Sequence, residues 1–225
     1  MTEELKKSID DLYTVFSKYP LRSKIEGCPC CVSDNDQLPL HKLPLKKLSS
    51  DDLSRFAFKA LTTWGTEDDF RHFLPRIFEL VATTGFGTHF FIVLDKLHYG
   101  KWTGWKQQEI DAIKLFLETW WYDMATGKTH FATDNFIDIL VFYNFEKNLL
   151  KDWKISFEDD SFTNLIAFIQ HLDRSHYRDI PGLSTWLIEH ITLIEKGFFH
   201  YEKQDKRLAK EISVCHDMVY ALTFT

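Results

Sequence analysis

Apolar side chains recur every three or four residues along most of this chain, and no other sequence feature constrains the fold as strongly. Near the N-terminus, Leu5, Ile9, Leu12 and Phe16 follow this spacing and would share one face of a helix. The spacing returns in about eight further stretches, and no convincing pair of alternating, strand-like segments accompanies it. The sequence therefore predicts an all-α protein of about nine helices packed as antiparallel pairs. We expect these helices near residues 3–18, 49–65, 66–85, 88–98, 105–125, 133–150, 160–174, 183–197 and 201–222.

Residue types that start or stop helices stand at the ends of these stretches. Ser49 and Asp52 have the spacing of a reciprocal cap, and the run 66–69 repeats that signal. Pro75 falls inside a predicted helix and should kink or split it. Gly127 should end the long helix that precedes it.

A weak internal repeat accompanies the helical pattern. The pair Phe73-Leu74 recurs 43 positions later as Phe116-Leu117, and Ala82-Thr83 recurs as Ala125-Thr126. This offset falls in the range of HEAT and armadillo repeats. The match covers barely two units, so right-handed stacking of that kind and a chance coincidence both stay open.

Composition bounds the class of protein. The 225 residues are 44% hydrophobic and 16% aromatic, which is enough for a large core without disulfide support. We expect one helical domain over residues 1–225. The net charge of −6 lacks the basic footprint of a nucleic-acid binder. The N-terminus does not resemble a signal peptide, and the apolar runs are too short to span a bilayer, so we expect a cytoplasmic protein with no nucleic-acid or membrane partner.

An irregular segment, residues 20–48, interrupts the helical pattern. It holds four of the six prolines and the stretch EGCPCCVS, which contains three of the four cysteines. Compact domains rarely keep so long a loop without a functional or structural reason. A bound metal ion would be one such reason.

The cysteine cluster is the strongest chemical signal in the chain. Cys28 and Cys31 form a C-x-x-C pair that can hold one tetrahedral ion such as zinc, and Cys30 is a third candidate ligand. His41 is the nearest candidate for a fourth. Other candidate ligands are Asp34, Asp36 and Cys215. Unliganded structural cysteines and redox chemistry stay open as alternatives, although no βαβ pattern of a thioredoxin-like site surrounds the cluster.

Residues 25–82 carry a resemblance. The runs EGCPCCVS, AFKALTTWG and DDFRHFLPR resemble an uncharacterised family of bacterial, cytosolic helical proteins. The resemblance implies no activity. It adds five positions to the cysteines and His41 as residues to test, and these would line a binding groove: Arg55, Trp64, Asp69, His72 and Arg76.

Two functions remain in view, and whether the protein is an enzyme stays open. The first is a non-enzymatic helical module that binds a protein or peptide and has a structural metal clip. The second is a zinc-dependent enzyme that uses the Cys28–Cys31 and His41 region, with Asp69, His72 or Arg76 approaching the ion. Four protein ligands would indicate a structural site, and three would indicate a catalytic one.

Overall fold

The computed structural model describes residues 1–143 and 148–224, and it confirms the prediction of an all-α protein. Every named element in the described residues is an α-helix or a 3₁₀ helix, and strand-like pairing is limited to two isolated bridges at Trp64. Among these residues, no helix has the length and apolar content needed to cross a bilayer.

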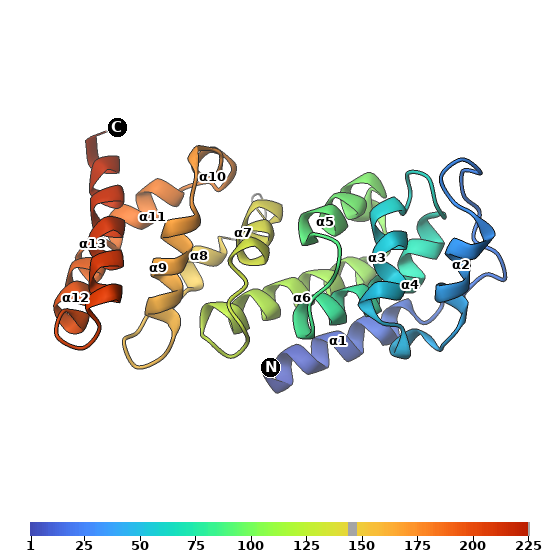
Figure 1. Cartoon of the computed structure of the whole chain (residues 1–225), viewed down its shortest axis with the longest axis horizontal. Helices are drawn as coiled ribbons and strands as arrows, with labels where there is room; N and C mark the ends of the chain where they lie inside the picture. Colours follow the sequence, from blue (N-terminus) through green and yellow to red (C-terminus); the bar gives the residue numbers. More distant parts are fainter. Residues whose placement is uncertain (144–147, 225) are drawn as a thin grey trace. The chain divides into compact units, whose positions relative to one another are not determined.

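The chain divides into two compact units, Met1–Trp120 and Trp121–Thr225. The single domain expected over residues 1–225 stays a prediction. The first unit contains α1 (Glu3–Phe16), α2 (Asp34–His41), α3 (Ser50–Lys59), α4 (Glu67–Thr83), α5 (Phe90–Tyr99) and most of α6 (Gln107–Ala125). It also has 3₁₀ helices at Leu45–Lys47 and Trp102–Gly104. The second unit contains α7 (Thr133–Phe142), α8 (Leu149–Asp152), α9 (Ser161–His171), α10 (Arg174–Asp179), α11 (Leu183–Glu189), α12 (Ile191–Tyr201) and α13 (Lys206–Ala221), followed by the 3₁₀ helix Leu222–Phe224 (Figure 1).

The described residues hold thirteen α-helices, so the expected count of about nine is too low. Three of the additional helices, α2, α8 and α10, have only four to eight residues and show too little apolar period to be seen in the sequence. The fourth arises because His190 divides the predicted helix 183–197 into α11 and α12. The predicted helix 133–150 is observed as α7, which ends at Phe142, and its residues 144–147 lie outside the described part.

The predicted helix boundaries have clear physical causes in the structure. The backbone N–H of Ser49 donates to the Asp52 carboxylate at 2.8 Å, and Thr66 makes the same bond to Asp69 at 2.8 Å. Gly127 follows α6 with φ +69°, a left-handed conformation that glycine adopts without strain. Pro75 does not split α4, which is assigned as one helix from Glu67 to Thr83.

Aromatic packing forms the core of the first unit. Helix α1 packs against α4. Phe56 of α3 meets Phe73 of α4 with ring centroids 4.7 Å apart, and Phe78 stacks on Phe116 of α6 at 4.7 Å. All four rings are fully buried, so each removes a large apolar area from water. These contacts make α4 the central helix of this unit.

A buried carboxylate ties the residues after α1 to this core. The Glu109 carboxylate of α6 accepts hydrogen bonds from the Lys18 ammonium and the Tyr19 hydroxyl, each at 2.6 Å. Its side chain is 1% exposed. Arg71 lies 4.2 Å above the Trp105 ring beside this group. Burial raises the pKa of Glu109, but the bonds from Lys18 and Tyr19 outweigh it and lower the pKa overall. The folded state therefore favours the charged carboxylate.

The ion pair between Glu109 and Lys18 should make the free energy of unfolding depend on pH. Because the pKa of Glu109 is lower in the folded chain than its ordinary 4.5, its stabilisation is complete above pH 4.5 and is lost as the pH falls through the folded value. The Glu109→Gln variant should be destabilised most at neutral pH, and its difference from wild type should shrink below pH 4.5. Urea unfolding between pH 7 and pH 3 measures this, with the exposed Glu4→Gln as control. A difference that does not change with pH would contradict it.

The second unit is organised around Trp153. Its ring stacks on Trp186 at 5.7 Å and meets Phe136 at 5.1 Å, and its indole N–H donates to the Ala125 carbonyl at 3.1 Å. Helices α12 and α13 pack against each other at the C-terminal end of this unit (Figure 1).

A glycine allows α12 to approach Phe162 of α9. A Cβ placed on Gly197 would lie 1.9 Å from the Phe162 ring, so Gly197→Ala should overpack the site and cost about 1–3 kcal/mol. The gain in helix propensity of at most about 1 kcal/mol offsets only part of this. Thermal unfolding measures the effect. Gly104→Ala is the matched control, because nothing lies within 4 Å of its Cβ. Equal melting temperatures for the two variants would contradict this packing.

Candidate metal centre

The residues Cys28–Cys31 form a tight turn. The N–H groups of Cys31 and Val32 both donate to the Cys28 carbonyl at 2.9 Å. Pro29 occupies the second position of this turn, where its restricted φ is favoured. The local sequence therefore sets the turn, which carries all three thiols.

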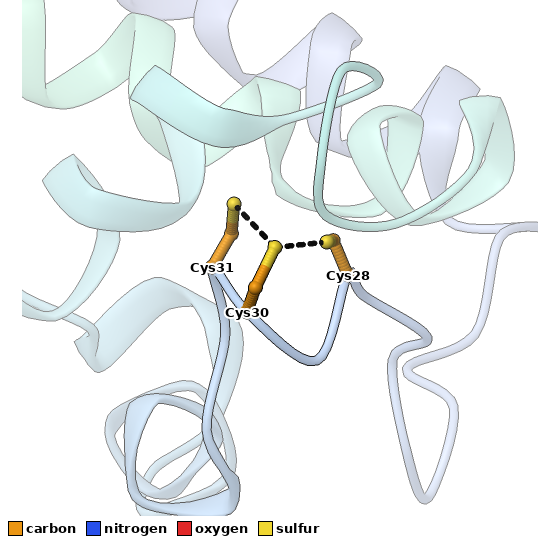
Figure 2. Close-up of side chains that lie close together, drawn as sticks. All are labelled: Cys28, Cys30 and Cys31. Carbon is orange, nitrogen blue, oxygen red and sulfur yellow. Dashed lines mark hydrogen bonds between the residues drawn. The ribbon is translucent and has the colours of Figure 1, made fainter.

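The turn brings three sulfur atoms together (Figure 2). The sulfur of Cys30 lies 2.8 Å from that of Cys28 and 3.6 Å from that of Cys31, and all three lie within 4.8 Å of one another. Cys30 is exposed, and the other two are partly exposed. The hydrogen bond from Cys30 lowers the pKa of Cys28, and the same contact raises the pKa of Cys30 to about 11.

The arrangement suits a thiophilic ion. At a zinc–sulfur distance of about 2.3 Å, two thiolates of a tetrahedral site lie about 3.8 Å apart. The separation of Cys30 and Cys31 is close to this value, and that of Cys28 and Cys30 has to open by about 1 Å. The three-cysteine group could hold a metal ion.

Backbone hydrogen bonds anchor the turn to the connection between α3 and α4. The Cys28 N–H donates to the Thr63 carbonyl at 2.8 Å, and the Gly65 N–H donates to the Glu26 carbonyl at 2.7 Å. The Lys59 ammonium, at the end of α3, donates to the Cys31 carbonyl. Sequence reasoning did not select Lys59 or Thr63, because their roles depend on contacts across about 30 residues and leave no local pattern.

The predicted fourth ligand lies outside the cluster. His41 occupies the last turn of α2 and is exposed, and it is not part of the group of three sulfurs. Within the described residues, no fourth cysteine, histidine or carboxylate joins them at that spacing. Asp34 pairs with Lys24 at 3.0 Å. Cys215 is fully buried in α13, where its thiol faces the Ile166 carbonyl at 3.7 Å.

The five predicted groove residues all contact the connecting segment, residues 17–49, which joins α1 to α3. On α3, Arg55 pairs with Asp36 at 2.7 Å. On α4, the Arg76 side chain donates to the Leu48 carbonyl at 2.8 Å. The Trp64 backbone forms a bridge with Gly27, and its ring is buried against Phe56.

The two remaining predicted groove residues, Asp69 and His72, also contact the connecting segment. Asp69 lies 3.4 Å from Arg22, and the His72 imidazole lies 2.7 Å from the Tyr19 carbonyl. Burial lowers the pKa of His72, and this effect outweighs the Tyr19 carbonyl and the Asp69 carboxylate, which raise it. These five residues therefore have an observed structural role, which is to hold the connecting segment in place. A binding groove formed by them stays a prediction.

No family model, curated protein or solved structure matches the chain. The resemblance to a bacterial family, and the origin and location that it implies, therefore stay expectations. The chemistry of the cysteine turn rests on its own geometry.

The burial of the four thiols predicts their reactivity. In metal-free, reduced protein, iodoacetamide should modify the accessible Cys28, Cys30 and Cys31 in the folded state, with Cys30 slower than Cys28 because its raised pKa leaves less thiolate. Cys215 should react only after unfolding, because burial raises its pKa to about 12 and excludes the reagent. Intact mass should show three adducts before urea is added and four after. The Cys215→Ala variant should show three in both states. A fourth adduct in folded wild-type protein at the same rate would contradict the assigned burial.

Proposed function

We propose that this protein is a non-enzymatic helical module whose N-terminal unit binds one thiophilic metal ion through Cys28, Cys30 and Cys31. Zinc is the first candidate from the sequence. The observation that carries the proposal is the convergence of three sulfur atoms within 4.8 Å on an exposed turn. Thiolates at this spacing bind soft and borderline ions strongly.

The geometry argues against a metal ion that stabilises the fold, because all three ligands come from four consecutive residues. A metal cross-link stabilises a fold mainly by closing a long loop of the unfolded chain. Here the unfolded chain would retain much of the same binding site, so the ion adds little to folding stability. The contacts of Arg55, His72 and Arg76 hold the connecting segment independently of a metal.

The zinc-dependent enzyme is the second candidate function. Three protein ligands leave one coordination position open, as a catalytic zinc site requires. The side chains expected to assist the chemistry are engaged elsewhere, because Asp69 caps α4 and His72 and Arg76 hold carbonyls of the connecting segment. These engagements support the non-enzymatic proposal.

A protein or peptide partner belongs to this proposal as an expectation, as does HEAT-like stacking of the helix pairs. Helices α12 and α13 border a shallow, open hollow of about 180 Å³ lined by Glu195, Phe198, Phe199, Ser213 and His216. Phe199 is 63% exposed there.

Metal content tests the proposal. Protein purified under reducing conditions without a metal-binding tag should carry about one equivalent of metal, whereas Cys28→Ser and Cys30→Ser should carry less than about a tenth. Cys215→Ser is the matched control and should keep the full equivalent. Chelation should lower the melting temperature by less than about 4 °C, since the ligands are local. Fully reduced wild-type protein that binds no metal, even when metal is supplied, would refute the proposal.

A further inference from the structure

We propose that the cysteine turn is selective for monovalent copper, which Cys28, Cys30 and Cys31 hold as a mononuclear, three-coordinate thiolate complex. This inference rests on the proposed function, because it specifies the ion that the same three residues bind.

The number and type of donors favour this ion. Structural zinc sites almost always have four ligands in a tetrahedron, and the catalytic ones complete it with water or substrate. The described residues offer three sulfurs and no nitrogen or oxygen donor at the same spacing. Thiolate ligands are preferred by Cu(I), by zinc and by iron–sulfur clusters. Of these, zinc favours a complete tetrahedron and an iron–sulfur cluster is held by four cysteines, whereas the singly charged Cu(I) ion is satisfied by three thiolates.

The shape of the turn restricts the site to one ion. The Cys30 sulfur lies between the other two, so a single ion on their exposed side can reach all three (Figure 2). The fourth cysteine is buried in the second unit, on α13, where it faces a backbone carbonyl. A cluster of several copper ions would need more than three bridging thiolates, so we expect a mononuclear complex.

The surroundings suit the charge of this complex. Three thiolates and one Cu(I) carry a net charge of −2, which a buried site could not hold without compensation. Here Cys30 is exposed to water, and the Lys59 ammonium is fixed at the Cys31 carbonyl. An exposed, three-coordinate ion is also open to attack by an external thiolate. In such an exchange one new Cu–S bond forms as one bond to the turn breaks, with no change in oxidation state.

Competition experiments on the full-length, reduced protein under anaerobic conditions test this inference. Cu(I) is offered against bicinchoninate, and Zn(II) against pyridylazoresorcinol. We expect one Cu(I) per chain and three sulfur scatterers in copper X-ray absorption. Bound Cu(I) should resist a hundredfold excess of zinc, and zinc alone should pass readily to its competitor.

Single-residue variants distinguish the metal ligands from residues that do not bind the ion. Serine at Cys28, Cys30 or Cys31 should lower the Cu(I) affinity by at least about tenfold, since loss of an outer-shell group alone costs that much. The His41→Ala and Cys215→Ala variants should bind as wild type does. The copper assignment would be overturned by binding that depends on His41, by a complex with two sulfur ligands, or by zinc held by four ligands. In each of these cases the proposed metal binding at the turn would still stand. Failure of both ions to bind would refute the proposed function itself.

Discussion

The anchoring of the connecting segment is the constraint on which the N-terminal unit depends. A long segment with little regular structure stays ordered only when its backbone polar groups find partners. Here α3 and α4 provide them, since His72 and Arg76 face the carbonyls of Tyr19 and Leu48. The same helices are fixed by the buried rings of Phe56 and Phe73. Aromatic packing therefore positions the cysteine turn indirectly.

Because helix packing fixes the cysteine turn, the folding of this unit does not depend on the metal binding that we propose. In many small metal-binding domains the ion supplies the folding free energy, and the apo chain is unfolded. In this protein the turn is already closed by the bonds to the Cys28 carbonyl and attached through Thr63. The ion that we propose for this turn would therefore leave and return without unfolding the unit, which suits exchange between thiolate sites better than permanent structural support.

The carboxylates show which side-chain interactions can be predicted from the sequence and which cannot. The acidic pairs at 51–52 and 68–69 follow helix-start signals in the sequence, and Asp52 and Asp69 bond the N-terminal backbone of α3 and α4. Glu109 carries no motif at all, and it is the buried centre of an ion pair with Lys18. Capping is a local event that a four-residue window reveals, whereas Lys18 and Tyr19, which bond Glu109, lie about 90 residues away from it.

The sequence by itself determined the features that depend on neighbours within about four residues: the all-α class, the cap at Ser49, the stop at Gly127 and the proline-containing cysteine turn. Only the tertiary structure decided what depends on distant contacts. It shows the interruption at His190, places His41 away from the three sulfurs, and pairs Arg55 with the connecting segment. The physical reason is that a helix with one buried face places its apolar side chains at a fixed spacing, which leaves a periodic trace in the sequence. A contact between residues far apart in the chain leaves none until the fold brings them together.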